Sequence, residues 1–421
     1  MKKVTVAIGL NKTKVGDLYF ETDGVRQSST FRYAPEWIDH PQSFALSPAM
    51  PISSVPYYAS GDRKKRQGAL LGPFTDASPD SWGRGIITKA VGGRPSELEF
   101  LLLSDDHTRI GALRFLDEEG NALANTEPPI PRLNDLQEIR QLAHIYESDP
   151  SVEKVELDAI MGYVGSLGGA RPKSNFDDEG ILSIAKFTSE FDTRPIERAE
   201  VATLNLAQSL GLSASNARIE LGKSHYPVAI IERFDRRDTA RIPFISAQTF
   251  LGLPEASGHY YTDIADQMFL HAIEPQKQVA ELYRRMMFGI LVGNTDCHLK
   301  NEGFLYAGQG KWALAPAFDI NPQPERHPHL ETGIYELSGF EASIEAALEA
   351  APYFEIKGEV AKKFLSELIN GIDREWKTHC KQAGMSGKEI KSYEPAFDSA
   401  QSKIARKLTT ERVSIRSFKP R

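Results

Sequence analysis

The sequence contains few cysteines and no long hydrophobic run. Only Cys297 and Cys380 occur among its 421 residues, which argues against a disulfide framework. Neither Cys-x-x-Cys nor His-Glu-x-x-His is present, so the sequence does not support structural zinc. No stretch approaches the length that spans a bilayer, and the apolar start at residues 4–8 is too short for a secretory signal. We therefore expect a cytoplasmic protein that does not use a membrane.

The charge of the chain gives little support for direct nucleic-acid binding. A net charge of −7 provides no global attraction to a polyanion. Two local basic clusters, at residues 63–66 and 403–421, are interpreted as solvated faces. A phosphate-contacting role for the second cluster stays an alternative, which salt-dependent DNA binding would reveal.

Length and composition predict more than one domain. A chain of 421 residues exceeds what a single core usually holds. The proline-rich loop at residues 121–133 is the best boundary after a mixed α/β module, because proline denies both helix continuation and strand pairing. Strand patterns follow up to about residue 235, and the rest is mainly helical. We predict three parts, 1–130, 131–235 and 236–421, of which the last two form the β-rich and helical lobes of an α+β core with a cleft.

Hydrophobic periodicity predicts the individual elements. Strands are expected at residues 4–8, 17–20, 110–116, 181–187 and 227–231. Helices are expected from residue 78, at 134–146, from Glu200 to a stop at Gly211, at 246–251, 262–273, 275–291, 344–350 and 360–372, and from about 396 to near the end.

Residues 293–301, GNTDCHLKN, together with Asp319, have the spacing of a phosphoryl-transfer site. Such a site needs a carboxylate that orients and deprotonates the acceptor hydroxyl, and Asp296 can serve. It also needs oxygen ligands for Mg²⁺, and Asn301 and Asp319 can supply them. Asp-x4-Asn alone is a weak signal, since roughly one chance match is expected in a chain of this length.

The surroundings of the motif make it more specific. The preceding helix is predicted to stop at Gly293, so the motif forms the loop that leaves a core-facing helix. Strand-like runs at residues 303–306 and 311–315 flank a glycine turn, and this hairpin would return Asp319 to the side of Asn301. Cys297 is interpreted as a small residue that fills the loop, and His298 as a hydrogen-bonding residue instead of a metal ligand.

Residues upstream of the motif suggest a nucleotide site. The small-residue loop at 162–173 would let backbone N–H groups approach phosphates, although such a loop is often only a turn. Lys186 shares a strand face with Leu182 and Ile184, so it either meets an anion or extends to solvent at the strand end. Glu200, in the first turn of the next helix, either pairs with Lys186 or stabilises the helix dipole. The strand at 227–231 ends in a polar segment that could contact an adenine edge.

Taken together, these segments resemble the HipA family of type II toxin–antitoxin Ser/Thr protein kinases over nearly the whole chain. The matching runs are FRYAPEW at 31–37, PDSWGR at 79–84, GGARPK at 168–173, IERFDR at 231–236, TDCHLKN at 295–301 and FD at 318–319. The resemblance implies a protein-kinase-like two-lobed core with a β-rich N-lobe, a helical C-lobe and an additional N-terminal α/β subdomain.

The resemblance also implies roles for individual residues. Asp296 would be the catalytic base, and Asn301 and Asp319 would bind Mg²⁺. Ser166 matches the serine whose autophosphorylation ejects the phosphate loop and shuts the enzyme down. Glu200 is kept, from its place in the sequence, as a candidate partner of Lys186. The residues expected around ATP are Gly168, Gly169, Ala170, Arg171, Lys173, Lys186, Glu232, Arg233, Phe234, His298 and Lys300.

Family membership would further imply partners. Relatives phosphorylate aminoacyl-tRNA synthetases or other translation proteins, and a HipB-like helix-turn-helix antitoxin carries the contact with DNA. Two other hypotheses are a catalytically weak corepressor that acts with such an antitoxin, and a small-molecule or lipid kinase on the same scaffold. The presence of Lys186, Asp296, Asn301 and Asp319 together favours the active kinase.

Overall fold

The computed structural model describes residues 1–61, 68–79, 81–123, 130–148, 171–224, 226–324 and 328–415. Residues 411–415 are described in backbone only. The chain forms two compact units that interleave along the sequence. Unit 1 comprises Met1–Phe191, Ile230–Glu255 and Phe304–Trp312, and unit 2 comprises Asp192–Ala229, Ala256–Gly303 and Ala313–Arg421.

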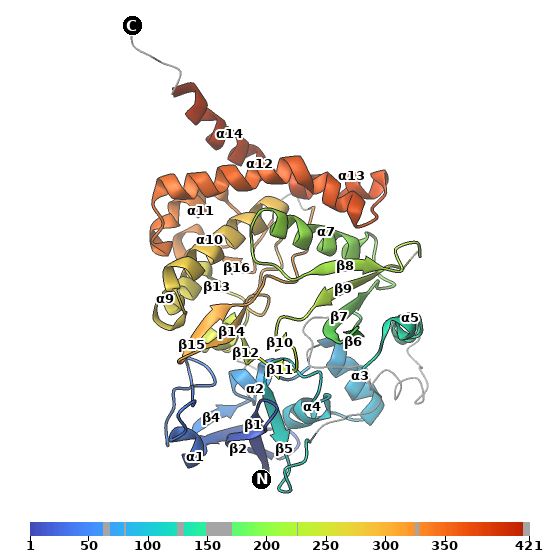
Figure 1. Cartoon of the computed structure of the whole chain (residues 1–421), viewed down its shortest axis with the longest axis vertical. Helices are drawn as coiled ribbons and strands as arrows, with labels where there is room; N and C mark the ends of the chain where they lie inside the picture. The colour runs from blue at the N-terminus through green and yellow to red at the C-terminus, as the bar shows by residue number, and fades with distance from the viewer. Residues whose placement is uncertain are drawn as a thin grey trace. The chain divides into compact units, whose positions relative to one another are not determined.

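Unit 1 begins with a five-stranded antiparallel sheet in the order β4-β3-β2-β1-β5 (Figure 1). Its strands are β1 (Lys2–Ile8), β2 (Thr13–Thr22), β3 (Gln27–Tyr33), β4 (Tyr57–Ser60) and β5 (Leu113–Leu116). The predicted strands at 4–8 and 17–20 are confirmed. The strand predicted at 110–116 starts later, because Gly111 has a φ of +72° that interrupts an extended ladder.

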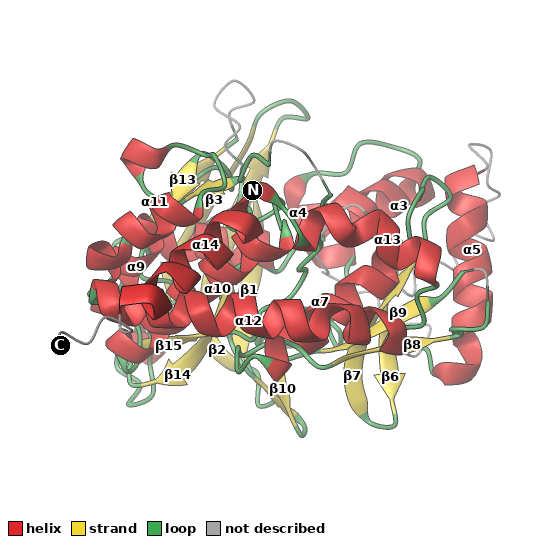
Figure 2. Ribbon diagram, turned by 90° about the horizontal axis from the view of Figure 1, so that it is seen from above, coloured by secondary structure: helices red, strands yellow, loops and turns green. Residues whose placement is uncertain are grey.

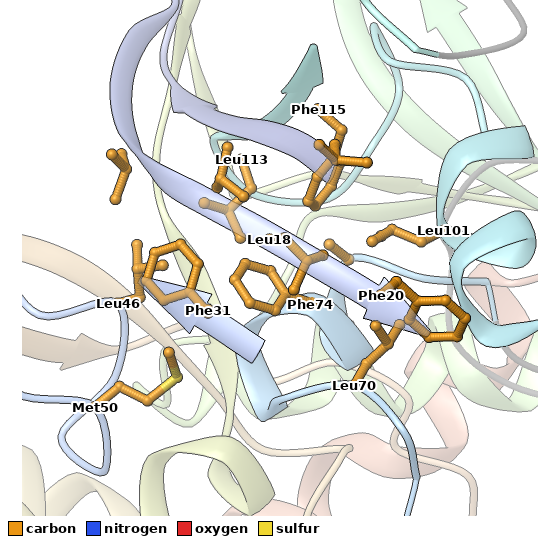
Figure 3. Close-up of a cluster of buried hydrophobic side chains, with 14 of the residues drawn as sticks. Leu18, Phe20, Phe31, Leu46, Met50, Leu70, Phe74, Leu101, Leu113 and Phe115 are labelled. Atoms are coloured by element: carbon orange, nitrogen blue, oxygen red, sulfur yellow. The ribbon is translucent and has the colours of Figure 1, made fainter. Parts of the chain in front are cut away.

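Unit 1 also contains the short helices α1 (Pro35–Ile38), α2 (Gly72–Asp76), α3 (Ser81–Val91) and α4 (Glu97–Leu103). Of these, α1, α2 and α4 contribute buried residues to the core of the sheet. Figure 3 shows the core between them, where Phe74 contacts Phe31 edge-on at 5.2 Å between ring centroids and Phe115 at 6.1 Å. The hydroxyl of Tyr33 donates to the Met50 carbonyl at 2.7 Å, which fixes the long loop before β4. The aromatic residues of this N-terminal segment therefore belong to the hydrophobic core of unit 1.

The rest of unit 1 carries the predicted lysine strand. A hairpin of β6 (Lys173–Asp178) and β7 (Ile181–Phe187) turns at Glu179 and Gly180, both with positive φ. The other elements are η1 (Leu133–Asp135), α5 (Leu136–Ser148), the end of β9 (Val228–Glu232), β10 (Arg236–Arg237), β11 (Ala240–Arg241), β12 (Phe244–Ser246), α8 (Ala247–Leu251) and the tip of the hairpin β14 (Gly303–Gly308) and β15 (Lys311–Leu314).

Unit 2 is mainly helical. Its elements are α7 (Ile196–Ser209), β8 (Ala217–Glu220), β13 (His259–Tyr260), α9 (Tyr261–His271), α10 (Pro275–Val292), β16 (Thr332–Gly333), η2 (Glu336–Ser338), α11 (Ile344–Glu349), η3 (Ala351–Phe354), α12 (Gly358–Gln382), α13 (Gly387–Phe397) and α14 (Ala400–Ile415). The long α12 packs along α7 and α14 (Figure 2), and α10 packs against α9. The Tyr283 hydroxyl donates to the Ala347 carbonyl at 2.7 Å and ties α10 to α11.

Several helix boundaries differ from the sequence prediction. The helix expected at 360–372 runs from Gly358 to Gln382 as α12. The final helix does not run from 396, because α13 ends at Phe397 and the Ser399 hydroxyl accepts a hydrogen bond from Ser402 N–H, a local cap that starts α14. Helix α7 begins at Ile196, directly after Pro195, so Glu200 lies in its second turn and Glu197 takes the first-turn position.

Candidate active site

The loop that follows α10 turns its residues alternately into unit 2 and away from it. Thr295, Cys297 and Leu299 are buried, and Asp296 is the exposed residue between the first two, with 55% of its side chain accessible. Small and apolar residues at the odd positions produce this alternation. The buried residues of the loop therefore hold the Asp296 carboxylate at the surface of unit 2.

Backbone hydrogen bonds fix the loop at both ends. Asn294 N–H donates to the Gly289 carbonyl at 2.8 Å, Leu299 N–H to Ala256 at 2.8 Å, and Glu331 N–H to the Thr295 carbonyl at 3.2 Å. The helix stops at Gly293, which has a φ of +70° and was predicted as the stop. Asp296 thus stands on a backbone anchored to three separate segments of unit 2.

The Cys297 thiol lies under the loop. Its Sγ is 3.7 Å from the Thr332 carbonyl oxygen, and burial raises the pKa of Cys297 to about 11. A thiol with this pKa stays protonated near neutral pH and is a poor nucleophile. The interpretation of Cys297 as a structural residue agrees with its burial.

His298 and Asn301 are both close to Asp296. The Nε2 atom of His298 lies 3.7 Å from Asp296 Oδ1, whereas its Nδ1 is buried without a hydrogen-bond partner in the described part of the chain. The expected hydrogen-bonding role of His298 is therefore not seen there. Asn301 donates from Nδ2 to the Asp296 carbonyl at 2.7 Å, which leaves its side-chain oxygen as the group available to a cation.

Asp319 occupies a strained position after β15. Its φ of +55° is uncommon for a residue with a side chain, although Asp and Asn tolerate it best. Asn321 donates from Nδ2 to Asp319 Oδ1 at 2.8 Å. Backbone strain of this kind occurs where the surrounding structure fixes the chain, and it often marks a functional segment.

Arg285 of α10 connects the segment after Asn301 with the segment before Asp319. Its guanidinium donates to the Ala315 carbonyl at 2.8 Å and contacts Glu302 Oε2 at 3.4 Å. Burial raises the pKa of Glu302, and the Arg285 charge opposes that shift. A cavity lies here, lined among others by Tyr261, Cys297, Asn301, Glu302 and Phe318.

The donor set suits a hard cation. Asn301 and Asp319 offer oxygen, the atom that Mg²⁺ prefers, and Mg²⁺ proteins often supply only one or two carboxylates beside phosphates. Among the described residues no cluster of three or more His, Cys, Asp or Glu side chains could hold a metal. The buried Oδ1 of Asn321, next to Asp319, has no hydrogen-bond partner in the described part, and a cation with its hydration shell would satisfy it.

In unit 1, two lysines face each other across the β6–β7 hairpin. Lys173 pairs in register with Lys186, so the two side chains project from the same face. The face of β7 that carries Lys186 is only half-buried, because Ser183, Ala185 and Phe187 make the buried face. Arg171 precedes β6. Gly168, Gly169, Ala170 and Ser166 lie outside the described residues.

The segment Glu232–Arg233–Phe234 alternates in the same way. The Arg233 side chain is buried and donates to Thr108 O, to Asn175 Oδ1 at 2.8 Å, and to Asp235 at 2.9 Å. Only Glu232 and Phe234 are partly exposed. The Arg233 side chain, expected near ATP, is thus committed to the interior of unit 1.

Asp235 is the centre of a buried ion network that sequence reasoning missed. Burial alone would raise the pKa of Asp235, but the charges of Arg233 and Arg236 and the Gly111 N–H bond lower it to about 2. Arg241 donates to the carbonyls of Asp106, Arg109 and Gly111. The signal was the density of Arg and Asp at 105–114 and 233–241, which only the fold brings together.

Glu200 is buried in the second turn of α7, with 2% of its surface accessible. Lys300 is half-buried at the end of the 293–301 loop. In the basic C-terminal cluster, Arg406 pairs with Asp373 and Asp398, so part of that charge is neutralised locally. No helix among the residues described above is both long and apolar enough to cross a bilayer.

The fold is α+β and protein-kinase-like, with a β-rich lobe, a helical lobe and an additional N-terminal subdomain. Residues 165–376 match the HipA-like C-terminal domain, and residues 6–116 match the HipA N-terminal domain. The chain belongs to the HipA family.

Individual relatives agree with this assignment. The chain is 26% identical over 312 residues to the putative kinase Y4mE of Sinorhizobium fredii, a match that covers 69% of this chain and 71% of that protein. It is 23% identical over 340 residues to the serine/threonine-protein kinase toxin HipA of Shewanella oneidensis, with 73% of each covered. A solved HipA of Shewanella oneidensis MR-1, in complex with HipB and its operator DNA, superposes with a TM-score of 0.67 at 16% identity over 97% of this chain and 99% of that chain.

Proposed function

We propose that this protein is an ATP-dependent Ser/Thr protein kinase of the toxin type, which transfers the γ-phosphoryl group of ATP to a protein hydroxyl in the cytoplasm. The observation that carries the proposal is in unit 2. An exposed Asp296 and the oxygen donors Asn301 and Asp319 stand on two segments joined to each other through Arg285 and the end of α10. Phosphoryl transfer requires this set of groups.

Asp296 serves as the group that receives the acceptor proton. Its carboxylate is accessible, so a substrate hydroxyl can approach it within hydrogen-bond reach. The His298 ring at 3.7 Å limits the directions the carboxylate can take. The loop's buried residues keep Asp296 in place while the substrate docks, which contributes orientation, a major part of the rate.

Asn301 and Asp319 would hold Mg²⁺, which neutralises negative charge on the phosphates when bound. Each residue has one polar atom fixed by a neighbour: Asn301 Nδ2 by the Asp296 carbonyl, and Asp319 Oδ1 by Asn321. The remaining oxygens are thereby oriented before any cation arrives. Preorganised ligands lose less entropy on binding.

Unit 1 would bind the nucleotide. Lys173 and Lys186 place two positive charges on one face of a hairpin, which an anion stabilises, and Arg171 adds a third nearby. The loop Gly168–Gly169–Ala170 would cover the phosphates. The adenine hinge would be formed by the backbone of Glu232, Arg233 and Phe234. The phosphate side of the site would be lined by His298 and Lys300. Glu200 would act as the partner of Lys186. The three predicted parts, 1–130, 131–235 and 236–421, would be the N-terminal subdomain and the two lobes.

Substrate and partners follow from the family. A translation protein such as an aminoacyl-tRNA synthetase is the proposed target, and a HipB-like helix-turn-helix antitoxin the proposed partner, through which the kinase would reach DNA. The solved HipA complex with HipB and operator DNA supports this choice of partner. We also propose that autophosphorylation at Ser166 inhibits the enzyme, since a phosphoserine would add nearly two negative charges beside the phosphate loop.

The test is transfer from labelled ATP. The purified chain is incubated with γ-labelled ATP, Mg²⁺ and a lysate of its host, and labelled proteins are identified by mass spectrometry. Asp296→Asn should abolish labelling with the fold intact, whereas Asp39→Asn, an exposed turn residue, should not change it. Ser166→Ala should remove self-labelling and prolong activity.

Other outcomes distinguish the alternatives. Label that appears only in small molecules or lipids would replace the protein acceptor. A wild-type chain that labels nothing, yet tightens operator binding by a HipB-like protein, would make it a corepressor.

A further inference from the structure

The segment after Asp319 is held against the end of α10 by a bridge made by two asparagines. Asn321 N–H donates to the side-chain Oδ1 of Asn294 at 3.2 Å, and Asn321 Nδ2 donates to Asp319 Oδ1 at 2.8 Å. Asn294 therefore contacts Asn321, and Asn321 contacts Asp319. This chain of contacts links the start of the Asp296 loop to the carboxylate at 319.

The backbone reinforces the bridge. Gln323 N–H donates to the Gly293 carbonyl at 2.8 Å, and Asn294 and Pro322 form an isolated antiparallel bridge. Asn294 N–H is in turn bonded to Gly289 within α10 at 2.8 Å. The buried helix α10 is thus the fixed reference for both segments.

We infer that Asn294 and Asn321 are positioning residues that set the Asp319 carboxylate for a divalent cation, a role that rests on the proposed function. The Asn321 amide donates to one oxygen of Asp319 and so fixes the orientation of the carboxylate. Its own Oδ1 is buried and has no partner in the described part of unit 2. That oxygen gives the cation's hydration shell a second acceptor beside Asp319.

The strained backbone of Asp319 explains why a bridge is needed. A non-glycine residue at φ +55° relaxes unless its neighbours hold it. Asn321 is two residues away and bonds both the side chain of Asp319 and Asn294, so it opposes that relaxation. Residues that orient a metal ligand typically change metal affinity about 10–100-fold when they are replaced.

The experiment measures cation binding directly. Mn²⁺ is titrated by electron paramagnetic resonance into the full chain with a non-hydrolysable ATP analogue, and analogue affinity is measured separately in EDTA. Asn321→Leu should weaken Mn²⁺ binding at least tenfold while analogue affinity in EDTA changes less than threefold. Asn294→Leu should weaken it similarly, and Asn294→Asp, which keeps an acceptor oxygen for Asn321 N–H, should restore it to within about threefold. These fold-changes follow from the range above.

The matched control is Asn370→Leu, an exposed asparagine of α12 whose side chain donates to Ser366 Oγ at 3.2 Å. It should bind Mn²⁺ as the wild type does. Undiminished Mn²⁺ binding by Asn321→Leu, or an equal loss of analogue affinity in EDTA, overturns the positioning role and leaves the proposed kinase standing. A wild-type chain that binds the analogue but no Mn²⁺ overturns both.

Discussion

Lys173 and Lys186 lie directly opposite each other on β6 and β7, with their side chains on the same face of the hairpin. Two like charges in register on paired strands destabilise a sheet by roughly 0.2–1 kcal/mol. An anion bound between them would reverse that effect. Under the proposed function, that anion would be the phosphate chain of ATP.

Replacing either lysine should separate binding from stability. In Lys186→Met, we expect ATP affinity by calorimetry to fall at least about tenfold, because one charge-assisted contact is worth about 1.5–3 kcal/mol. The melting temperature of the nucleotide-free protein should stay close to the wild-type value, because methionine keeps an unbranched side chain of similar length. Lys223→Met, at an exposed lysine outside the hairpin, should change neither quantity. A lower melting temperature with unchanged ATP affinity would show that the pair is structural.

Asp235 should control acid stability. Its pKa is about 2 in the folded protein against 3.8 as the ordinary value, because Arg233 and Arg236 favour the ionised form over the opposing effect of burial. A depressed carboxyl pKa stabilises the fold above about pH 4, and the contribution, about 2 kcal/mol, is lost as the pH falls towards 2. Urea unfolding between pH 2 and 6 measures this loss.

Asp235→Asn tests the same network by removing its charge. Buried Arg233 and partly buried Arg236 would lose their carboxylate, and breaking a buried ion pair typically costs about 3–5 kcal/mol. The variant should also lose most of its pH dependence below pH 4, whereas Asp39→Asn should keep it. Equal stability of Asp235→Asn and the wild type at pH 6 would contradict the role of the network.

Local patterns in the sequence were sufficient to predict most elements, because a strand or helix of one unit buries a periodic face. The stop at Gly293, the strand at 181–187 and the helices at 262–273 and 275–291 could be predicted in this way. The breaks at Gly111 and Ser399 could not, because a positive φ and a side-chain cap depend on the atoms around them. The network at Asp235 was also missed, since its hydrogen bonds join segments more than a hundred residues apart.

For the candidate site, too, the sequence predicts motif residues but not the contacts that the fold creates between them. The spacing of the motif predicts Asp296, Asn301 and Asp319 as candidate site residues, because motif spacing can be read from the sequence alone. Spacing did not reveal Asn294, Asn321 or Arg285, whose contribution lies in hydrogen bonds across the fold. Residues that position others have no motif of their own in a single sequence.

The two cysteines should be inert in the folded protein. Burial raises the pKa of Cys297 to about 11 and that of Cys380 to about 12, and both are buried. We expect no rapid reaction with an aromatic disulfide reagent at pH 8, and two thiols per chain after denaturation. Fast labelling of Cys297 in the native protein would mean that the 293–301 loop opens readily.

Gly293 should be required for the site and not only for the helix end. Its φ is +70°, and a Cβ added there would lie 2.9 Å from the Gln323 carbonyl oxygen, whereas Gly310 has φ +71° and nothing within 4 Å of such a Cβ. Both alanine variants incur a left-handed backbone cost of roughly 1–2 kcal/mol. Only Gly293→Ala also displaces residues 322–323, and with them Asn321 and Asp319. We therefore expect a larger loss of melting temperature in Gly293→Ala than in Gly310→Ala, and a loss of phosphoryl transfer and of Mn²⁺ affinity in Gly293→Ala alone. Equal activity in the two variants would mean that the contact between Gly293 and Gln323 does not position Asp319.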